Sequence, residues 1–567
     1  MPSDSVPELS SMDVARLLLA TLQTHEVRDV VICPGSRSAP LAYALAEAEA
    51  AGTIRLHVRI DERDAGFTAL GLSLASGAPV PVVTTSGTAV GELLPAVMEA
   101  NHVGARLVVL SADRPTELHG TGANQTTNQI DLFGVHVRSS INISAGGNPD
   151  SLVASAMAAA AGTNLLAPGP VQINVAFRDP LVPGPGDSLP TFGANLSSPP
   201  VPQNHENNIS WGTPQQGAEF RTVVVAGHGA GPEAEDFARA LGLPLFAEPS
   251  SNARFGPNAI GPYRPLLARH AHRIERVVLF GRATLSRPVA LLLGNTDIQT
   301  ALWAPKPAPW FEPGRRREQL ISKAAELVRF AGNPPAGWLG CWQELGKQAE
   351  TLIEECVDAG GLFNGPLVAR EVWARVEGNL VLGSSNVIRD VDLCGAPQGR
   401  ASARVYANRG LAGIDGTVAT ATGIARARTA TKTTLLVGDV TFLHDVGGLL
   451  IGDGEPEPEM EVVVLNDAGG AIFSTLEHGA VAESGNYANA VERLFATPHK
   501  VRISSLAEAY GWQYVGVQSL DELRKLLSTG ATGRRIIEVV VSRKELRTMH
   551  TSIADAVNTL SWPVAEG

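Results

Sequence analysis

The chain has 567 residues, 44% of them hydrophobic, and a formal net charge of -12 at pH 7. This length and hydrophobic content predict about three globular domains and exclude a largely disordered chain. An acidic chain without a long Lys/Arg run is a poor partner for nucleic acid. The sequence has no stretch of about eighteen uninterrupted apolar residues, so it does not predict a membrane-spanning helix.

The four cysteines are widely spaced and form no C-x-x-C motif, so they predict reduced thiols rather than a zinc site or a disulfide framework. The first ten residues lack the basic run and apolar core of a secretory signal. We therefore expect a soluble protein of the cytoplasm.

Helix-like segments alternate with short strands over roughly the first 180 residues. Strands rich in Val, Ile and Leu are expected at 30–33, 56–60, 79–85 and 106–112. Strands that are buried on both faces and separated by helices are typical of a doubly wound parallel sheet. The segment 1–185 is therefore predicted to be an α/β domain.

The rest of the chain repeats this alternation twice. A Pro-, Gly-, Ser- and Asn-rich stretch at 186–219 predicts a linker. A central Rossmann-like domain at 220–335 and a third α/β domain at 336–567 follow it. Their main strands are expected at 221–227, 276–281, 379–385, 433–439, 461–467 and 535–541. The predicted fold class is three doubly wound parallel-sheet domains in series.

Two carboxylates follow neighbouring strands of the third domain. Asp439 ends the strand TTLLVGD, and Asp467 ends the strand EVVVLND, which a glycine turn follows. Ligands collect at the carboxyl ends of parallel strands, and carboxylate and carbonyl oxygens are the ligands that Mg²⁺ prefers. Either aspartate alone would be read as a turn or helix-capping residue, but the pair predicts a metal site that holds phosphate oxygens.

The spacing of GDV and NDAGG resembles the thiamine-diphosphate motif of the thiamine-diphosphate-dependent enzymes. Val440 stands where that motif commonly has Gly, and Asp467 stands where it has Asn. The resemblance implies Mg²⁺ or Mn²⁺ bound by Asp439, Asp467 and the carbonyl of Gly469. It implies cofactor-binding roles for Glu62, Ser86, Gly87, Ser384, Ser385, Ile414, Gly438, Asp439, Val440, Thr441, Asp467, Gly469, Gly470 and Ile472.

Glu62 follows the strand LHVRI and precedes a helix-like segment, which is where this family places its catalytic glutamate. That glutamate hydrogen-bonds the aminopyrimidine ring and so promotes loss of the thiazolium proton. A glutamate at the start of a helix is otherwise an ordinary surface residue. In this family the two cofactor-binding domains come from different subunits, which implies a homodimer or homotetramer with active sites between subunits.

Arginines recur in loops at strand ends, and guanidinium groups are natural partners of carboxylates. With the strings CPGSRS, GTGANQTTNQ, NRGLAGIDG and NDAGGAIF, these loops resemble the 2-succinyl-5-enolpyruvyl-6-hydroxy-3-cyclohexene-1-carboxylate synthases of menaquinone biosynthesis. The resemblance implies a transferase that decarboxylates 2-oxoglutarate and adds the resulting carbanion to isochorismate in a 1,4-fashion. It implies catalytic roles for Glu62, Arg389 and Arg409, and substrate contacts from Ser36, Arg37, Arg114, Asn124, Gln125, Arg389, Arg409, Ile472 and Phe473.

Three alternatives stay open. The stretch Gly227 to Gly231, with Glu248 after the next strand, approaches a dinucleotide fingerprint, although Pro232 occupies the place of its third glycine. An NAD-dependent oxidoreductase or a silent binding protein with an anionic effector at Arg282 and Arg287 are the distant alternatives. Among thiamine enzymes, an acetohydroxyacid synthase or a 2-oxoacid decarboxylase is the runner-up, but neither needs many arginine loops.

Overall fold

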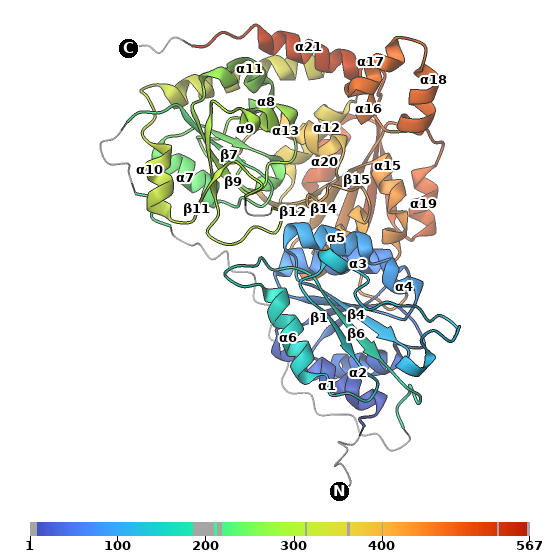
Figure 1. Ribbon diagram of the computed structural model, residues 1–567. Helices are drawn as coiled ribbons and strands as arrows, with labels where there is room; N and C mark the ends of the chain where they lie inside the picture. The colour runs from blue at the N-terminus through green and yellow to red at the C-terminus, as the bar shows by residue number, and fades with distance from the viewer. Residues whose placement is uncertain are drawn as a thin grey trace.

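The computed structural model describes residues 8–184, 209–212, 218–311, 314–359, 363–399, 401–529 and 532–563. Its strands form three sheets, and every strand pairing that the structure describes is parallel. Helices surround each sheet (Figure 1), which confirms the predicted α/β fold class. Within these stretches, no helix is both long and apolar enough to span a bilayer.

The first sheet consists of β1 (Asp29–Ile32), β2 (Arg55–Val58), β3 (Val80–Thr84), β4 (Leu107–Asp113), β5 (Ser140–Ile143) and β6 (Val171–Ala176). Its helices are α1 (Ser11–Thr24), α2 (Ala39–Ala50), α3 (Glu62–Ser76), α4 (Thr88–Gly91), α5 (Leu94–Val103) and α6 (Asp150–Ala161). Helices α1, α2 and α6 build one apolar layer, and α3 and α5 build another. The inner strands are fully buried because helices cover both faces of the sheet.

The middle sheet consists of β7 (Thr222–Ala226), β8 (Leu245–Ala247), β9 (Arg276–Phe280), β10 (Gln299–Trp303) and β11 (Gln319–Ile321). Its helices are α7 (Glu233–Leu241), α8 (Tyr263–His270), α9 (Arg287–Gly294) and α10 (Ala324–Ala331). The strand order β11-β10-β9-β7-β8 places the Val-rich strands β7 and β9 inside the sheet.

The third sheet consists of β12 (Gly378–Leu382), β13 (Ala403–Tyr406), β14 (Thr433–Gly438), β15 (Met460–Asn466), β16 (Gln513–Val517) and β17 (Arg534–Val540). Its helices are α12 (Gly365–Arg375), α13 (Asn386–Cys394), α14 (Thr417–Ala427), α15 (Asp439–His444), α16 (Ile472–Thr475), α17 (Glu477–Glu483), α18 (Ala488–Val491), α19 (Ile503–Ala509) and α20 (Leu520–Thr529). The strand order β13-β12-β14-β15-β17-β16 makes β14 and β15 neighbours at the centre of the sheet.

Helix α3 of the first unit packs against α14 of the third unit so closely that their backbones are in contact. A Cβ at Gly71 would lie 2.1 Å from the carbonyl oxygen of Thr420, and a Cβ at Gly423 would lie 2.1 Å from that of Thr68. Side chains larger than a hydrogen atom therefore do not fit on either helix at this contact. The close packing fixes where the start of α3 lies relative to the third sheet.

The predicted domain boundaries stay predictions, although the three sheets fall within the three predicted segments. Most of the predicted linker 186–219 lies outside the described residues. Helix α11 (Trp338–Asp358) begins the third predicted segment, and α21 (Leu546–Asn558) lies near its end. Both helices contribute side chains to a core built around the middle sheet. The long helices at the top of Figure 1 thus tie the third segment to the second.

Candidate functional site

The two predicted metal-binding aspartates lie at neighbouring strand ends of the third sheet. Strand β14 pairs with β15 up to Gly438 and Leu465, and each aspartate follows within two residues of that pair. Asp439 is the first residue of α15, and Asp467 begins the loop after β15. The sheet thus brings together two carboxylates that are separated along the chain.

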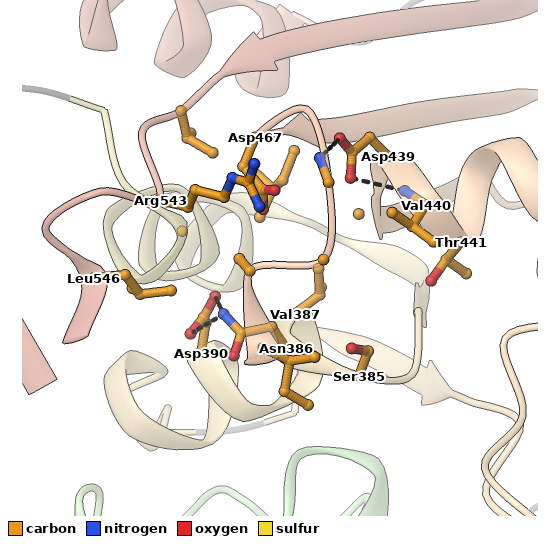
Figure 2. A pocket seen from close by; sticks show the side chains of 18 of the residues that line it. Ser385, Asn386, Val387, Asp390, Asp439, Val440, Thr441, Asp467, Arg543 and Leu546 are labelled. Atoms are coloured by element: carbon orange, nitrogen blue, oxygen red, sulfur yellow. Dashed lines mark hydrogen bonds between the residues drawn. The ribbon is translucent and has the colours of Figure 1, made fainter. Parts of the chain in front are cut away.

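A pocket surrounds this pair (Figure 2). Ten of the predicted cofactor-binding residues line it: Ser384, Ser385, Gly438, Asp439, Val440, Thr441, Asp467, Gly469, Gly470 and Ile472. Residues that the sequence analysis did not select also line it, and they include Asn386, Asp390, Arg543 and Leu546. All of the residues that line this pocket come from the third unit.

Asp439 is held in place by hydrogen bonds to its carboxylate. The backbone N–H of Val440 donates to Oδ1 at 2.7 Å, and the N–H of Gly469 donates to Oδ2 at 2.9 Å. The ring nitrogen Nε2 of His499 also lies 2.9 Å from Oδ2. Burial raises the pKa of Asp439, and these contacts oppose the rise. The carboxylate therefore has a fixed orientation within the pocket.

Asp467 is the less satisfied of the two carboxylates. Among the described residues, its Oδ1 is buried and has no hydrogen-bond partner. Burial and the neighbouring Asp439 raise the pKa of Asp467 to about 8, although Arg543 lowers it. Arg543 compensates these two neighbouring carboxylates only in part, so a divalent cation bound to both would lower their repulsion and give Oδ1 of Asp467 a partner. The donor set therefore fits the predicted metal.

Arg543 brings a positive charge to the same pocket. Figure 2 shows its guanidinium beside Asp467. Its Nη2 donates to Glu492 at 2.5 Å, and a Cβ at Gly469 would lie only 3.1 Å from its Nη1. An arginine next to a metal site suits a diphosphate group. Its place just after β17, which pairs with β15, was the sequence signal that could have identified it.

Glu62 lies away from this pocket in the same chain. It starts α3, where Asp61 caps the helix by accepting from the N–H groups of Arg63 and Asp64. Arg63 donates to the carbonyl of His444 at 3.3 Å, so this end of α3 contacts the far end of α15 from Asp439. Glu62 is half-buried, and burial raises its pKa. It does not line the pocket at Asp439.

A second polar cluster lies in the first unit. Arg114 donates to Ser86 and, at 2.5 Å, to the carbonyl of Gln125. Gln125 in turn donates to the carbonyl of Ser86 at 2.9 Å, and Gly87 adopts a φ of 87° beside it. Arg37 is close enough to lower the pKa of Arg114, after the larger effect of burial. Ser36 and Asn124 are exposed near these residues in the sequence.

Two further predicted arginines lie together in the third unit. Burial lowers the pKa of Arg389, and the nearby charge of Arg409 lowers it further. Ser384 links this pair to the pocket by donating to the carbonyl of Asn408 at 3.2 Å. The predicted apolar residues are half-buried and are Ile414, Ile472 and Phe473, of which Ile472 lines the pocket.

The middle unit does not favour the dinucleotide alternative. Glu248, which would have to reach a ribose, is buried, and its Oε1 accepts from the N–H groups of Thr284 and Leu285 at 2.9 Å. Arg282 donates to the carbonyl of Gly410 at 2.6 Å, and Arg287 forms an exposed ion pair with Glu477. These contacts hold Glu248 and Arg282 within the fold, which does not favour a role for Glu248 at a ribose.

Two family models match the chain. The N-terminal TPP binding domain of thiamine pyrophosphate enzymes matches residues 12–132, and the C-terminal TPP binding domain matches residues 396–541. These segments hold Glu62 and the two aspartates, respectively.

Curated relatives match almost the whole chain. A protein of Paenarthrobacter aurescens is 58% identical, with 98% of both chains covered, and one of Arthrobacter sp. is 56% identical, with 100% of this chain and 95% of the relative covered. A third, from Renibacterium salmoninarum, is 54% identical over 98% of this chain and 99% of its own. All three are named 2-succinyl-5-enolpyruvyl-6-hydroxy-3-cyclohexene-1-carboxylate synthase. The chain therefore belongs to this family of thiamine pyrophosphate enzymes.

Proposed function

We propose that the chain catalyses the reaction for which its relatives are named. It would release CO₂ from 2-oxoglutarate and join the remaining four-carbon unit to isochorismate, which gives 2-succinyl-5-enolpyruvyl-6-hydroxy-3-cyclohexene-1-carboxylate. The observation that carries this proposal is the pair Asp439 and Asp467 within a chain that matches these synthases over nearly its full length.

Thiamine diphosphate with a divalent metal ion is the cofactor of this enzyme family. When bound, it supplies a nucleophilic carbon that can attack a 2-oxo acid. Asp439, Asp467 and the carbonyl of Gly469 would hold Mg²⁺ or Mn²⁺. We add Arg543 to the predicted cofactor-binding residues, because its positive charge would face the diphosphate group. The unpartnered Oδ1 of Asp467 supports this assignment.

Glu62 is proposed to hold the aminopyrimidine ring of the cofactor. Burial raises its pKa, which favours sharing of a proton between the carboxyl group and a ring nitrogen. The cap of Asp61 fixes the backbone at the start of α3, and the helix dipole there stabilises the ionised form of the Glu62 carboxyl group. Glu62 would therefore orient the ring and control its protonation.

The arginines are proposed to bind the two dicarboxylate substrates. Arg37 and Arg114 lie near one another in the first unit, as do Arg389 and Arg409 in the third. Pairs of like charges at strand ends are unfavourable without an anion, and a substrate carboxylate would compensate each pair. The four arginines equal in number the four carboxylates of the two substrates.

A homo-oligomer would complete the active site. In one chain, Glu62 lies outside the pocket at Asp439, which supports a glutamate from a second copy at the pyrimidine end of the cofactor. Large apolar side chains near Glu62 are exposed, with Ile60 at 67% and Val58 at 42%. Exposed apolar surface beside a half-site supports a contact between copies. A dimer or a tetramer satisfies this requirement, and the cytoplasmic location stays a prediction.

The deciding experiment mixes the purified protein with Mg²⁺, thiamine diphosphate, 2-oxoglutarate and isochorismate and identifies the product by mass. The expected product contains all atoms of isochorismate and the four-carbon unit. Release of succinic semialdehyde at the same rate without isochorismate would show a simple decarboxylase instead. Consumption of pyruvate but not of 2-oxoglutarate would favour an acetohydroxyacid synthase.

A further inference from the structure

The loop that follows β13 carries Arg409 and is contacted by side chains from all three units. Arg409 itself is 3% exposed, which is unusual for a residue that is to meet a substrate. A buried guanidinium depends on partners that hold it in one conformation. The neighbours of this loop therefore decide where its charge points.

The middle unit holds the guanidinium directly. Nε of Arg409 donates to Oγ1 of Thr284 at 3.2 Å, and Nη2 donates to both Oγ1 and the carbonyl oxygen of Thr284 at 3.0 Å. Glu248 anchors Thr284 by accepting from its N–H at 2.9 Å. Nη1 of Arg409 donates to no group within the described residues, so this edge of the guanidinium is free to meet an anion.

The first unit holds the backbone next to Arg409. Glu99, on α5, accepts from the N–H of Gly410 at 2.6 Å through Oε1 and from the N–H of Leu411 at 2.7 Å through Oε2. Glu99 is 4% exposed, and a Cβ at Gly410 would lie 2.8 Å from the carbonyl oxygen of Glu99. Both oxygens of one buried carboxylate are thus used to fix two successive peptide groups.

We propose that Thr284 and Glu99 are positioning residues that fix the guanidinium of Arg409 for a substrate carboxylate. The inference rests on the proposed function, in which Arg409 binds one of the two dicarboxylates. It gives the middle unit a part in substrate binding through Thr284, although that unit contributes no residue to the pocket at Asp439. Glu99 gives the first unit a part in substrate binding through the backbone next to Arg409.

The test compares variants of the full-length enzyme at Thr284. Thr284→Val keeps the shape and the carbonyl group but removes the hydroxyl acceptor. Arg409→Ala identifies the dicarboxylate that Arg409 binds as the one whose KM rises most. Thr284→Val should raise the KM of that same dicarboxylate by about tenfold, with a smaller change in kcat. Thr284→Ser should restore the KM because it keeps the hydroxyl.

Thr222→Val is the matched control. Thr222 also lies in the middle unit, and its buried hydroxyl donates to the carbonyl of Ala331 at 2.6 Å, away from the Arg409 loop. This variant should lower the melting temperature and leave both KM values unchanged. A Thr284→Val protein that loses thermal stability in the same way, without a change of KM, would overturn the inference.

A double-mutant cycle separates this inference from the role of Arg409 itself. If Thr284 acts through Arg409, Thr284→Val should have no further effect on KM in the Arg409→Ala background. Glu99→Gln, which keeps only one acceptor oxygen, should likewise have no further effect on KM in the Arg409→Ala background. Additive effects on KM in either cycle would overturn the positioning role but would leave the substrate role of Arg409 untouched. Unchanged KM values in Arg409→Ala would overturn the substrate role of Arg409 and the inference with it.

Discussion

Replacing Glu248 by glutamine should change how the stability of the protein depends on pH. Glu248 is 1% exposed, and burial raises the pKa of its carboxyl group from the usual 4.5 to about 7. The folded protein thus keeps a proton that the unfolded chain releases. The contribution of Glu248 to the free energy of unfolding is complete below about pH 4.5 and is lost as the pH rises through about 7.

The size of the effect follows from the two pKa values. A rise from 4.5 to about 7 corresponds to roughly 3 kcal/mol of unfolding free energy. Glutamine keeps an oxygen that can accept from the N–H groups of Thr284 and Leu285, but it cannot ionise. Between pH 4.5 and pH 8, the variant should therefore gain roughly 3 kcal/mol relative to the wild-type protein.

Urea unfolding followed by tryptophan fluorescence measures this difference at steps of pH. Trp211 and Trp342 lie in the two cores that flank the middle sheet, so their emission reports the unfolding of the unit that contains Glu248. The exposed Glu219→Gln variant is the control and should follow the wild-type curve. Parallel curves for Glu248→Gln and the wild type would refute the argument that burial controls this carboxyl group.

Three further changes test the candidate site and the fold. Glu62→Gln should keep cofactor binding, measured by calorimetry, but lower turnover by about a hundredfold or more, and retained turnover would contradict its role. Asp439→Ala should abolish the rise in melting temperature that Mg²⁺ with thiamine diphosphate gives the wild type, whereas an equal rise would exclude Asp439 as a ligand. Gly416→Ala should cost about 3 kcal/mol in urea unfolding, because its Cβ would lie 1.9 Å from Phe67 at a φ of 59°. A Gly416→Ala protein that is as stable as the wild type would mean that the start of α14 can shift to make room for the added methyl group.

The central strands could be predicted from the sequence because their physical signal is local. Strands such as β3 and β15 are runs of Val, Ile and Leu that are buried on both faces. The edge strands β5, β11, β13 and β16 were not predicted. Each pairs on one side only and is partly exposed, so its sequence carries a weaker apolar signal. The inner strands β6 and β10 were not predicted either, because polar residues interrupt or shorten their apolar runs.

The candidate site could be predicted only in part. Asp439 and Asp467 follow central strands, so strand order alone brings them together. Arg543 follows β17, the neighbour of β15, so strand order could also have pointed to it, whereas Asp390 enters the pocket from α13 and no local pattern connects it with the aspartates. The distance of Glu62 from the pocket depends on how α3 packs on α14, which is a tertiary property. Motif matching could identify Asp439, Asp467 and Glu62 one by one, but it could not predict how these residues are arranged in space.

The glycine contact between α3 and α14 also limits how the sequence can diverge. Because Gly71 and Gly423 each face backbone atoms of the other helix, a substitution at either position cannot be compensated by a smaller partner side chain. Only a shift of a whole helix would make room, and that shift would move the helix that begins with Glu62. A substitution at either position would therefore also change the position of Glu62, although neither glycine lies in the pocket at Asp439.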